Sequence, residues 1–193
     1  MDNSQITIAV DAMGGDNSPS KVLKGIELFL NKKPNTKIVI FGNKNKIEEL
    51  LINKKYQIRD SKIIDSINNI EDDDIVKTIL RHRKDSSISK GLEYIKEFKH
   101  SGFVSAGNTA ALMILSKTQL GMIDGIDRPA ICSIIPNDKN FSIMLDLGAN
   151  STVVAKNLLQ FAIMGYCYHT ILKPNVKPRI GIINIGTENN KGL

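Results

Sequence analysis

Short, continuously apolar runs alternate along this chain with longer segments that have the periodicity of a helix. The runs ITIAV (6–10) and KIVIF (37–41) are apolar and β-branched, and KIID (62–65) is a weaker example of the same kind. Between the first two runs, apolar residues recur every three or four positions, which is the spacing of one helix face. Runs that are apolar throughout are typical of strands buried on both faces. The pattern therefore predicts a parallel sheet covered by helices.

The same alternation continues to the end of the chain. Ser18 followed by Pro19 is a capping residue before a proline, so we expect the first helix to open there. Further strands are expected at 102–105, 130–135, 141–145 and 179–184 (RIGIIN), and further helices around 47–51, after Ser86–Ser87 and over 156–172. Alternating strands and helices predict an α/β protein, a three-layer α/β/α arrangement with a mainly parallel sheet.

Composition limits the number of domains and the cellular compartment. A chain of 193 residues with 41% hydrophobic residues is long enough for one well-buried domain, so we expect a single α/β domain over 1–193. No secretory signal is visible at the N-terminus, and the longest apolar stretch, 158–172, is too short to span a bilayer. Two cysteines make no disulfide framework, which favours the reducing cytoplasm, and Cys167 in an apolar helical run is expected to be buried and inert.

The net charge of +6 and the pI near 9.2 raise the question of a nucleic-acid partner. The chain is rich in Lys, Asn and Ile together, a coding bias of AT-rich genomes that produces a basic balance by itself. The lysines are spread along the chain, and aromatic residues do not alternate with them as a stacking surface requires. We therefore expect no nucleic acid, and a mildly basic face for an acidic protein or a phosphorylated substrate.

Four of the strand-like runs lead into loops rich in Gly, Asn, Asp and Ser. The loops are DAMGGD (11–16), SAGNTAA (105–111), DLGAN (146–150) and NIGTENNKG (184–192). Each loop taken alone is explained by a tight turn or a helix cap. In a parallel sheet, however, the loops that leave the carboxyl ends of strands share one edge. Four of them there favour an anion site built from backbone N–H groups and helix N-termini.

Standard catalytic motifs are absent from the sequence. It contains no dinucleotide fingerprint, P-loop, nucleophile elbow or H-E-x-x-H pair, and its three histidines lack metal-ligand spacing. We therefore expect no metal, no cofactor and no covalent catalyst.

Seven motifs occur in order and together resemble the signature set of the PlsX family. They are VDAMGGD near the N-terminus, RKDSSIS (83–89), FVSAGNTAAL (103–112), GIDRPA (125–130), MLDLGAN (144–150), LLQFAIMG (158–165) and NIGTENNKG (184–192). The likeness runs from residue 6 to the end of the chain. Two departures are Ala110, where the family pattern has Gly, and STVVA at 151–155.

The resemblance implies a phosphate acyltransferase that moves a long-chain acyl group from acyl carrier protein to inorganic phosphate at the start of phospholipid synthesis. It also implies a fold like that of isopropylmalate dehydrogenase and phosphotransacetylase, a homodimer, and peripheral association with the inner face of the membrane. Family members continue beyond position 193, so the chain resembles the N-terminal portion of a longer domain. We accordingly expect residues 1–193 alone to be inactive and to aggregate or require a partner.

Such a reaction needs no protein nucleophile, because desolvated phosphate can attack a thioester directly. The protein must hold the dianion and stabilise the tetrahedral oxyanion. The resemblance and the loops together indicate Asn108 and Lys191 as catalytic, with backbone N–H groups of Gly14–Gly15 and Ser86–Ser87 binding phosphate. Asp11, Asp146 and Glu188 are expected to orient these groups, and for Asp146 a capping role in its own loop is an equal alternative. The remaining candidates for binding phosphate or substrate are Asp16, Ser105, Gly107, Thr109, Gly148, Asn150 and Gly186.

Two other functions remain open from the sequence. One is a dehydrogenase or another nucleotide enzyme on the same fold, and the other is a non-catalytic fragment that only dimerises or binds carrier protein.

Overall fold

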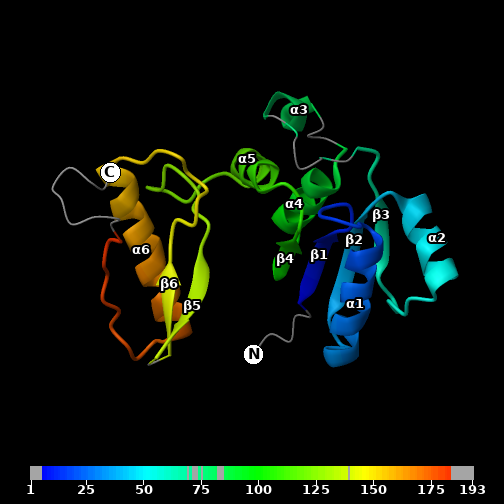
Figure 1. The fold of residues 1–193 in the computed structure, drawn as a ribbon, viewed down its shortest axis with the longest axis horizontal. Coiled ribbons are helices and arrows are strands. Elements are labelled where there is room, and N and C mark those ends of the chain that lie inside the picture. The colour runs from blue at the N-terminus through cyan, green and yellow to red at the C-terminus, as the bar shows by residue number, and fades with distance from the viewer. Residues whose placement is uncertain are drawn as a thin grey trace. The chain divides into compact units, whose positions relative to one another are not determined.

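The computed structural model describes residues 6–68, 70, 74, 76–81, 85–138 and 140–183 of the 193-residue chain (Figure 1). The chain divides into two compact units, Met1–Gly121 and Met122–Leu193. Among the described residues, the first unit has a four-stranded sheet and the second a two-stranded one. The expectation of a single domain over 1–193 stays a prediction.

The sheet of the first unit is parallel throughout, as the apolar runs predict. Its strands are β1 (Thr7–Asp11), β2 (Lys37–Gly42), β3 (Lys62–Asp65) and β4 (Ser101–Val104), in the order β3-β2-β1-β4 (Figure 1). The register places Thr7 opposite Lys37 on one side and Ser101 on the other. The central strands β1 and β2 are almost wholly buried, which explains why their sequences are continuously apolar.

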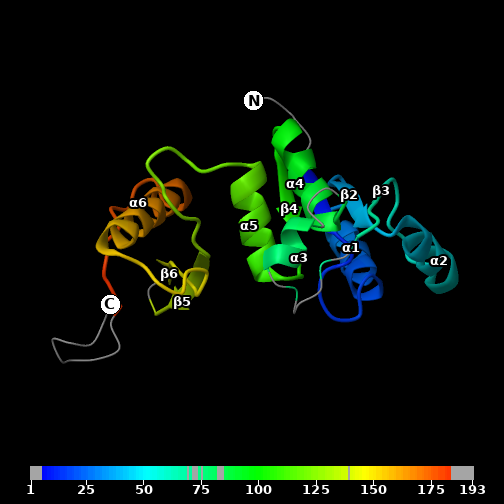
Figure 2. The same cartoon turned by 90° about the horizontal axis from the view of Figure 1, so that it is seen from above.

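Helices cover both faces of this sheet and complete the predicted three layers (Figure 2). The helices are α1 (Ser20–Lys32), α2 (Lys44–Lys54), α3 (Val76–Arg81), α4 (Ser87–Glu97) and α5 (Thr109–Gln119). On one face, Leu23 and Leu30 of α1 and Ile47 of α2 share a core with β2. On the other face, Tyr94 and Ile95 of α4 pack against β1 and β2, and α5 packs against α4.

The order of strands reverses between β1 and β4. From β1 the chain moves outward to β2 and β3, then returns through α4 to β4 on the opposite side of β1. In open α/β sheets, ligands bind outside the carboxyl ends of the strands at such a reversal. The loops at this position are DAMGGD after β1 and SAGNTAA after β4.

The second unit corrects two predictions made from the sequence. The strands expected at 130–135 and 141–145 form an antiparallel hairpin, β5 (Ser133–Asn137) and β6 (Asn140–Met144), outside the parallel sheet. Only two residues separate them, whereas parallel neighbours need a long crossover. The expected strand RIGIIN is wrong over 179–183, where the chain has no regular secondary structure, and position 184 lies outside the described residues.

Helix α6 (Ala155–Leu172) follows the hairpin at the position that the periodicity predicts. Cys167 on this helix is exposed, not buried as expected. The helix is apolar on several sides, but only the side with Asn157, Gln160 and Phe161 is buried. No helix in the described part of the chain combines the length and apolarity needed to cross a bilayer. In the first unit, α1 begins two residues after Ser18, whose hydroxyl donates to the Gly14 carbonyl instead of capping the helix.

Candidate functional site

Asp11 joins the two loops that meet at the reversal of strand order. It is the last residue of β1 and its side chain is buried. The Ser105 hydroxyl, directly after β4, donates to Asp11 Oδ2 at 2.7 Å, and the Met13 N–H donates to Oδ1 at 2.9 Å. Both carboxylate oxygens therefore accept hydrogen bonds, one from each loop.

Glycines let the backbones of the same two loops come into contact. A Cβ added to Gly14 would lie 2.5 Å from the Gly107 nitrogen and 2.8 Å from its Cα. Gly15 has φ +86°, and a Cβ there would lie 2.9 Å from the Ala106 carbonyl oxygen. The Gly107 N–H donates to Ser105 Oγ at 3.1 Å. Packing of one loop on the other therefore requires glycines at 14 and 15, because no side chain fits between the two backbones.

Two helices present their N-termini at the carboxyl edge of the sheet. Helix α4 ends close to the amino edge, where the His100 carbonyl accepts from the Thr7 N–H at 3.2 Å, so its first turn lies at the carboxyl edge. Ser86 caps it by accepting from the Ser89 N–H at 3.1 Å. Helix α5 starts directly from the second loop and is capped by Asn108, whose Oδ1 accepts from the Ala111 N–H at 2.9 Å. The N–H groups of a helix's first turn and its positive dipole end favour an anion.

The predicted site residues divide between the two units, and some lie outside the described residues. At the carboxyl edge of the first unit are Asp11, Gly14, Gly15, Asp16, Ser86, Ser87, Ser105, Gly107, Asn108 and Thr109. In the second unit are Asp146, Gly148 and Asn150. Gly186, Glu188 and Lys191 lie outside the described residues. Asn108, Ser86 and Ser87 are buried, whereas Asp16 and Thr109 are exposed.

Ala110, the departure from the family pattern, lies in the first turn of α5 and is exposed. It is not among the residues with positive φ. The helix accepts an alanine here without strain, so the added methyl group does not disturb the loop.

Asp146 organises the DLGAN loop of the second unit. Its Oδ1 accepts from the N–H groups of Ile131 at 2.9 Å and Ala149 at 3.1 Å. Its Oδ2 accepts from the N–H and the side-chain amide of Asn150 at 2.8 and 2.9 Å. Partial burial raises the pKa of Asp146, but these hydrogen bonds outweigh it and hold the pKa below its ordinary value. The geometry is that of a loop cap, and a part for Asp146 in catalysis stays a prediction.

Sequence reasoning missed two residues at the carboxyl end of β3. The Lys90 ammonium, one turn into α4, donates to the Asp65 carbonyl at 2.7 Å, and Asp65 Oδ1 accepts from the Lys44 N–H at 2.9 Å. They bring a cation to the same edge as the two loops. The sequence signals were weak but present, since Asp65 ends a strand-like run and Lys90 lies one turn after the capping residue Ser86.

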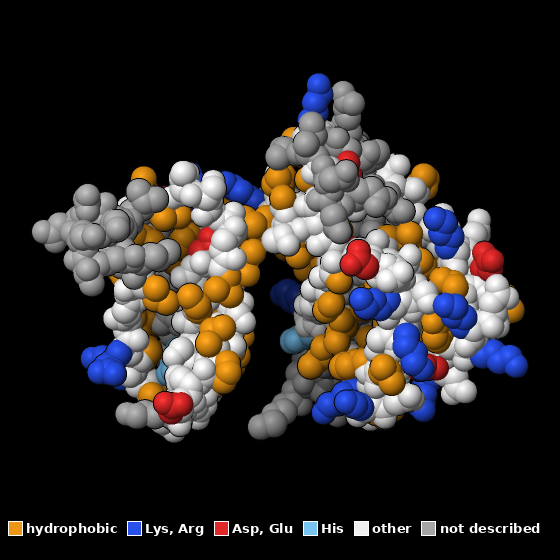
Figure 3. Space-filling model, in the orientation of Figure 1, with side chains coloured by type: hydrophobic (Ala, Val, Ile, Leu, Met, Phe, Trp, Pro, Cys, Tyr) orange, Lys and Arg blue, Asp and Glu red, His pale blue; other side chains and the backbone are white. Residues whose placement is uncertain are grey.

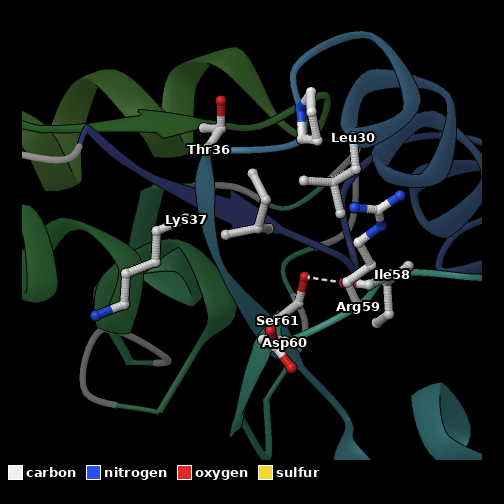
Figure 4. A pocket seen from close by; sticks show the side chains of 9 residues that line it. Leu30, Thr36, Lys37, Ile58, Arg59, Asp60 and Ser61 are labelled. Carbon is white, nitrogen blue, oxygen red and sulfur yellow. Dashed lines mark hydrogen bonds between the residues drawn. The ribbon is translucent and has the colours of Figure 1, made fainter.

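A pocket of about 360 Å³ lies at the opposite edge of the sheet (Figure 4). It is bounded by the end of α1, the start of β2 and the turn before β3, where the Ser61 hydroxyl donates to the Ile58 carbonyl at 2.6 Å. None of the predicted site residues lines it. The candidate site is therefore defined by the converging loops and helix ends and not by this cavity. Across the described ranges, no three His, Cys, Asp or Glu side chains are grouped so as to hold a metal ion.

The chain matches one protein family and several relatives that share one name. The model of the family described as "Fatty acid synthesis protein" matches residues 6–193. A phosphate acyltransferase of Caldicellulosiruptor bescii is 43% identical over 185 residues, which are 96% of this chain and 55% of that protein. Phosphate acyltransferases of Pelagibacter ubique (40% identical) and Wolbachia pipientis wMel (41% identical) match 97% and 98% of the chain and 56% of their own lengths.

The chain thus spans about half the length of the curated relatives that it matches. The family match covers nearly the whole chain and includes the two loops that converge on Asp11. The chain belongs to the fatty acid synthesis protein family, which is the PlsX family that its sequence motifs resemble.

Proposed function

We propose that this protein is a phosphate acyltransferase that transfers a long-chain acyl group from acyl carrier protein to inorganic phosphate. The relatives named above support the acyltransferase class. The observation that carries the proposal is the convergence of the β1 and β4 loops, tied through Asp11, beside the first turns of α4 and α5. Several backbone N–H groups and two dipole ends at one edge suit a phosphate dianion.

In the proposed site, phosphate is held by N–H groups of Gly14–Gly15 and of the first turn of α4 after Ser86 and Ser87. Asp11 is a positioning residue, because it fixes the Ser105 hydroxyl and the turn at Met13. Asn108 Oδ1 accepts from the Ala111 N–H, which sets the orientation of the amide. We assign the NH₂ group of that amide to the thioester oxygen.

The reaction requires no protein nucleophile. A phosphate oxygen attacks the thioester carbonyl carbon, so a C–O bond forms and the carbonyl oxygen becomes an oxyanion. The intermediate then collapses, the C–S bond breaks, and the thiol of the carrier protein leaves after taking up the proton from hydrogen phosphate. One preorganised donor to such an oxyanion lowers the barrier by about 2.7–4 kcal/mol. Lys191, outside the described residues, is assigned to charge stabilisation in the same step.

The products are an acyl phosphate, for phospholipid synthesis, and free carrier protein. A cytoplasmic homodimer that associates peripherally with the inner face of the membrane belongs to the same proposal and is supported by the family resemblance.

The test is phosphate-dependent formation of acyl phosphate from long-chain acyl carrier protein by the complete protein. Asn108→Ala and Lys191→Ala should each lower the rate by orders of magnitude. Asn108→Asp separates capping from catalysis, because aspartate keeps the helix cap but cannot donate to an oxyanion. It should retain thermal stability and lose activity. Full activity of Asn108→Asp would remove the amide from the mechanism.

Cysteine variants supply the control for direct attack by phosphate. Cys132→Ser and Cys167→Ser should retain acyl transfer. Strong inactivation of either variant in folded protein would indicate an acyl-cysteine intermediate instead. Nicotinamide-dependent turnover without acyl transfer would favour the dehydrogenase alternative.

A further inference from the structure

The positive charge of this chain is concentrated in one segment. Residues 20–62 contain eleven Lys and Arg against four Asp and Glu, a net charge of +7, whereas the whole chain has +6. All other residues together therefore contribute −1. Lysines occur along the whole chain, as expected, but outside this segment acidic residues balance them.

The segment comprises α1, β2, α2 and the connection to β3, and β2 is buried except for Lys37 at its start. All eleven basic residues are exposed. Figure 3 shows Lys and Arg side chains over α1 and α2, with few acidic side chains among them. We call the exposed side chains of residues 20–62, on α1, α2 and the connections beside them, the basic surface.

Hydrogen bonds and a shared core hold the two helices of the basic surface together. The Lys54 ammonium on α2 donates to Ser20 Oγ at the start of α1 at 2.9 Å, and Ser20 Oγ lies 3.0 Å from the Tyr56 hydroxyl. The Gln57 N–H donates to Glu27 Oε1 on α1 at 3.0 Å. The charges are therefore presented by a fixed framework.

Most of these cations are not neutralised by the protein. Within the described part of the chain, the segment has two ion pairs, Lys24–Glu27 at 2.5 Å and Lys44–Glu48 at 3.7 Å. The Lys24 hydrogen bond holds the pKa of Glu27 below its ordinary value, so this acid stays ionised in its pair. An excess of like charge in one region destabilises a fold through self-repulsion and favours association with an oppositely charged partner.

We propose that the basic surface docks an acidic protein. The inference rests on the proposed function, in which the acyl donor is a carrier protein. Both helices begin at the carboxyl edge, α1 after the DAMGGD loop and α2 after Gly42, so a protein bound there lies beside the candidate site. Complementary charge accelerates encounter and selects the partner.

The side chains between the cations favour a protein over a membrane or a nucleic acid. Leu28 and Ile52, 53% and 75% exposed, provide isolated apolar contacts among charges, as at a protein interface. A membrane-bound helix needs a broad apolar face, but that face of α1 is already packed in the core. A surface that binds single-stranded nucleic acid stacks successive bases on several aromatic side chains, whereas α1 and α2 together have one, Phe29.

The test reverses two charges at positions that should not disturb folding. Lys21 and Lys46 lie in the first turns of α1 and α2, where glutamate is favourable to the helix dipole. The matched control, Lys96→Glu/Lys99→Glu, lies at and just beyond the end of α4, which covers the opposite face of the sheet. Neither pair belongs to the proposed phosphate site.

In the complete protein, Lys21→Glu/Lys46→Glu should raise KM for acyl carrier protein about tenfold at low salt and leave kcat within about twofold. The difference from wild type should shrink as ionic strength rises towards about 0.5 M. The control pair should keep the wild-type KM. An unchanged KM in the first variant, or an equal rise in the control, would overturn the inference while leaving the acyltransferase proposal intact.

Calorimetric binding of carrier protein without an acyl group gives a readout that does not depend on activity. The Lys21→Glu/Lys46→Glu variant should bind about tenfold more weakly than wild type, and the control pair equally well. If wild type binds the carrier in this way but transfers no acyl group, the proposed function fails and the docking inference stands. If the variant loses affinity only for phosphatidylglycerol vesicles and still binds carrier protein, the docking inference is overturned in favour of a lipid surface.

Discussion

Single residues control how closely the β1 and β4 loops approach each other. Gly14→Ala would place a methyl group 2.5 Å from the Gly107 nitrogen, a backbone atom that cannot move independently of its loop. Overpacking of this kind costs about 1–3 kcal/mol. We expect Gly14→Ala to lower the free energy of unfolding by that amount and to impair the proposed acyl transfer.

Gly25→Ala is the matched control for this prediction. Gly25 lies exposed within α1, with nothing within 4 Å of an added Cβ. Alanine there should raise the free energy of unfolding by about 0.5–1 kcal/mol. Urea denaturation of both variants measures the difference, and equal stability of the two would contradict the described contact between the loops.

The Asp146 carboxylate predicts a pH dependence in the second unit. Its pKa in the folded state lies below the ordinary value of 3.8, so its stabilising contribution is complete above pH 3.8 and is lost as pH falls through the folded-state pKa. Asp146→Asn should therefore weaken protection of the Ile131, Ala149 and Asn150 amides from hydrogen exchange at neutral pH. This difference from wild type should diminish in strong acid.

Asp124→Asn is the control for Asp146, because Asp124 is exposed and in the same unit. It should leave the three amides protected as in wild type at every pH. Protection that is unaffected by Asp146→Asn at neutral pH would mean that the DLGAN loop does not depend on the carboxylate.

Sequence reasoning at the residue scale worked where the signal is local. It placed Ser86 directly before α4, because a capping residue precedes a helical pattern there. It did not predict that Ser105 donates to Asp11, 94 positions away, or that Lys90 reaches the end of β3. Those contacts depend on which strands are neighbours, and a local pattern does not contain that information.

At the scale of elements, periodicity predicted most helices and strands but not the direction of every strand. The periodic segments that became α2, α4 and α6 and the apolar run that became β2 were found near their observed bounds. The β5–β6 pair was expected as part of the parallel sheet, because an apolar run looks alike in either direction. The short connection between those strands was the available signal for an antiparallel hairpin.

The packing of α4 on β4 depends on Gly91. A Cβ at this position would lie 2.1 Å from the Phe103 ring, and both elements contribute to the core of the first unit. Gly91→Ala should lower the free energy of unfolding by about 1–3 kcal/mol, measured by urea denaturation. Phe103→Leu shortens the opposing side chain, so the double variant should be less destabilised than the sum of the two single variants.

Gly102→Ala controls for the loss of a glycine near the same contact. Gly102 is the neighbour of Phe103 in β4, and nothing lies within 4 Å of an added Cβ. We expect at most a small change in stability for this variant. Additive effects of Gly91→Ala and Phe103→Leu would show that the ring and the helix backbone are not in contact.

At the scale of the whole molecule, the buried apolar core is unequally divided. The three core clusters of the described residues, built on both faces of the parallel sheet, lie within Met1–Gly121. In the described part of the second unit, Phe161 is the one hydrophobic side chain that is buried, whereas Leu159, Ile163 and Ile171 are half or more exposed. The first unit therefore contains most of the stabilising burial.

This division predicts different behaviour of the two units as separate polypeptides. Burial of apolar surface contributes roughly 25 cal/mol per Å², and a short segment with little core cannot offset its conformational entropy. Residues 1–121 should fold alone and unfold cooperatively in urea. Residues 122–193 should show no cooperative transition by circular dichroism, and their exposed apolar side chains should make them aggregate. A monomeric 122–193 fragment with a sharp unfolding transition would show that the hairpin and α6 form a sufficient core by themselves.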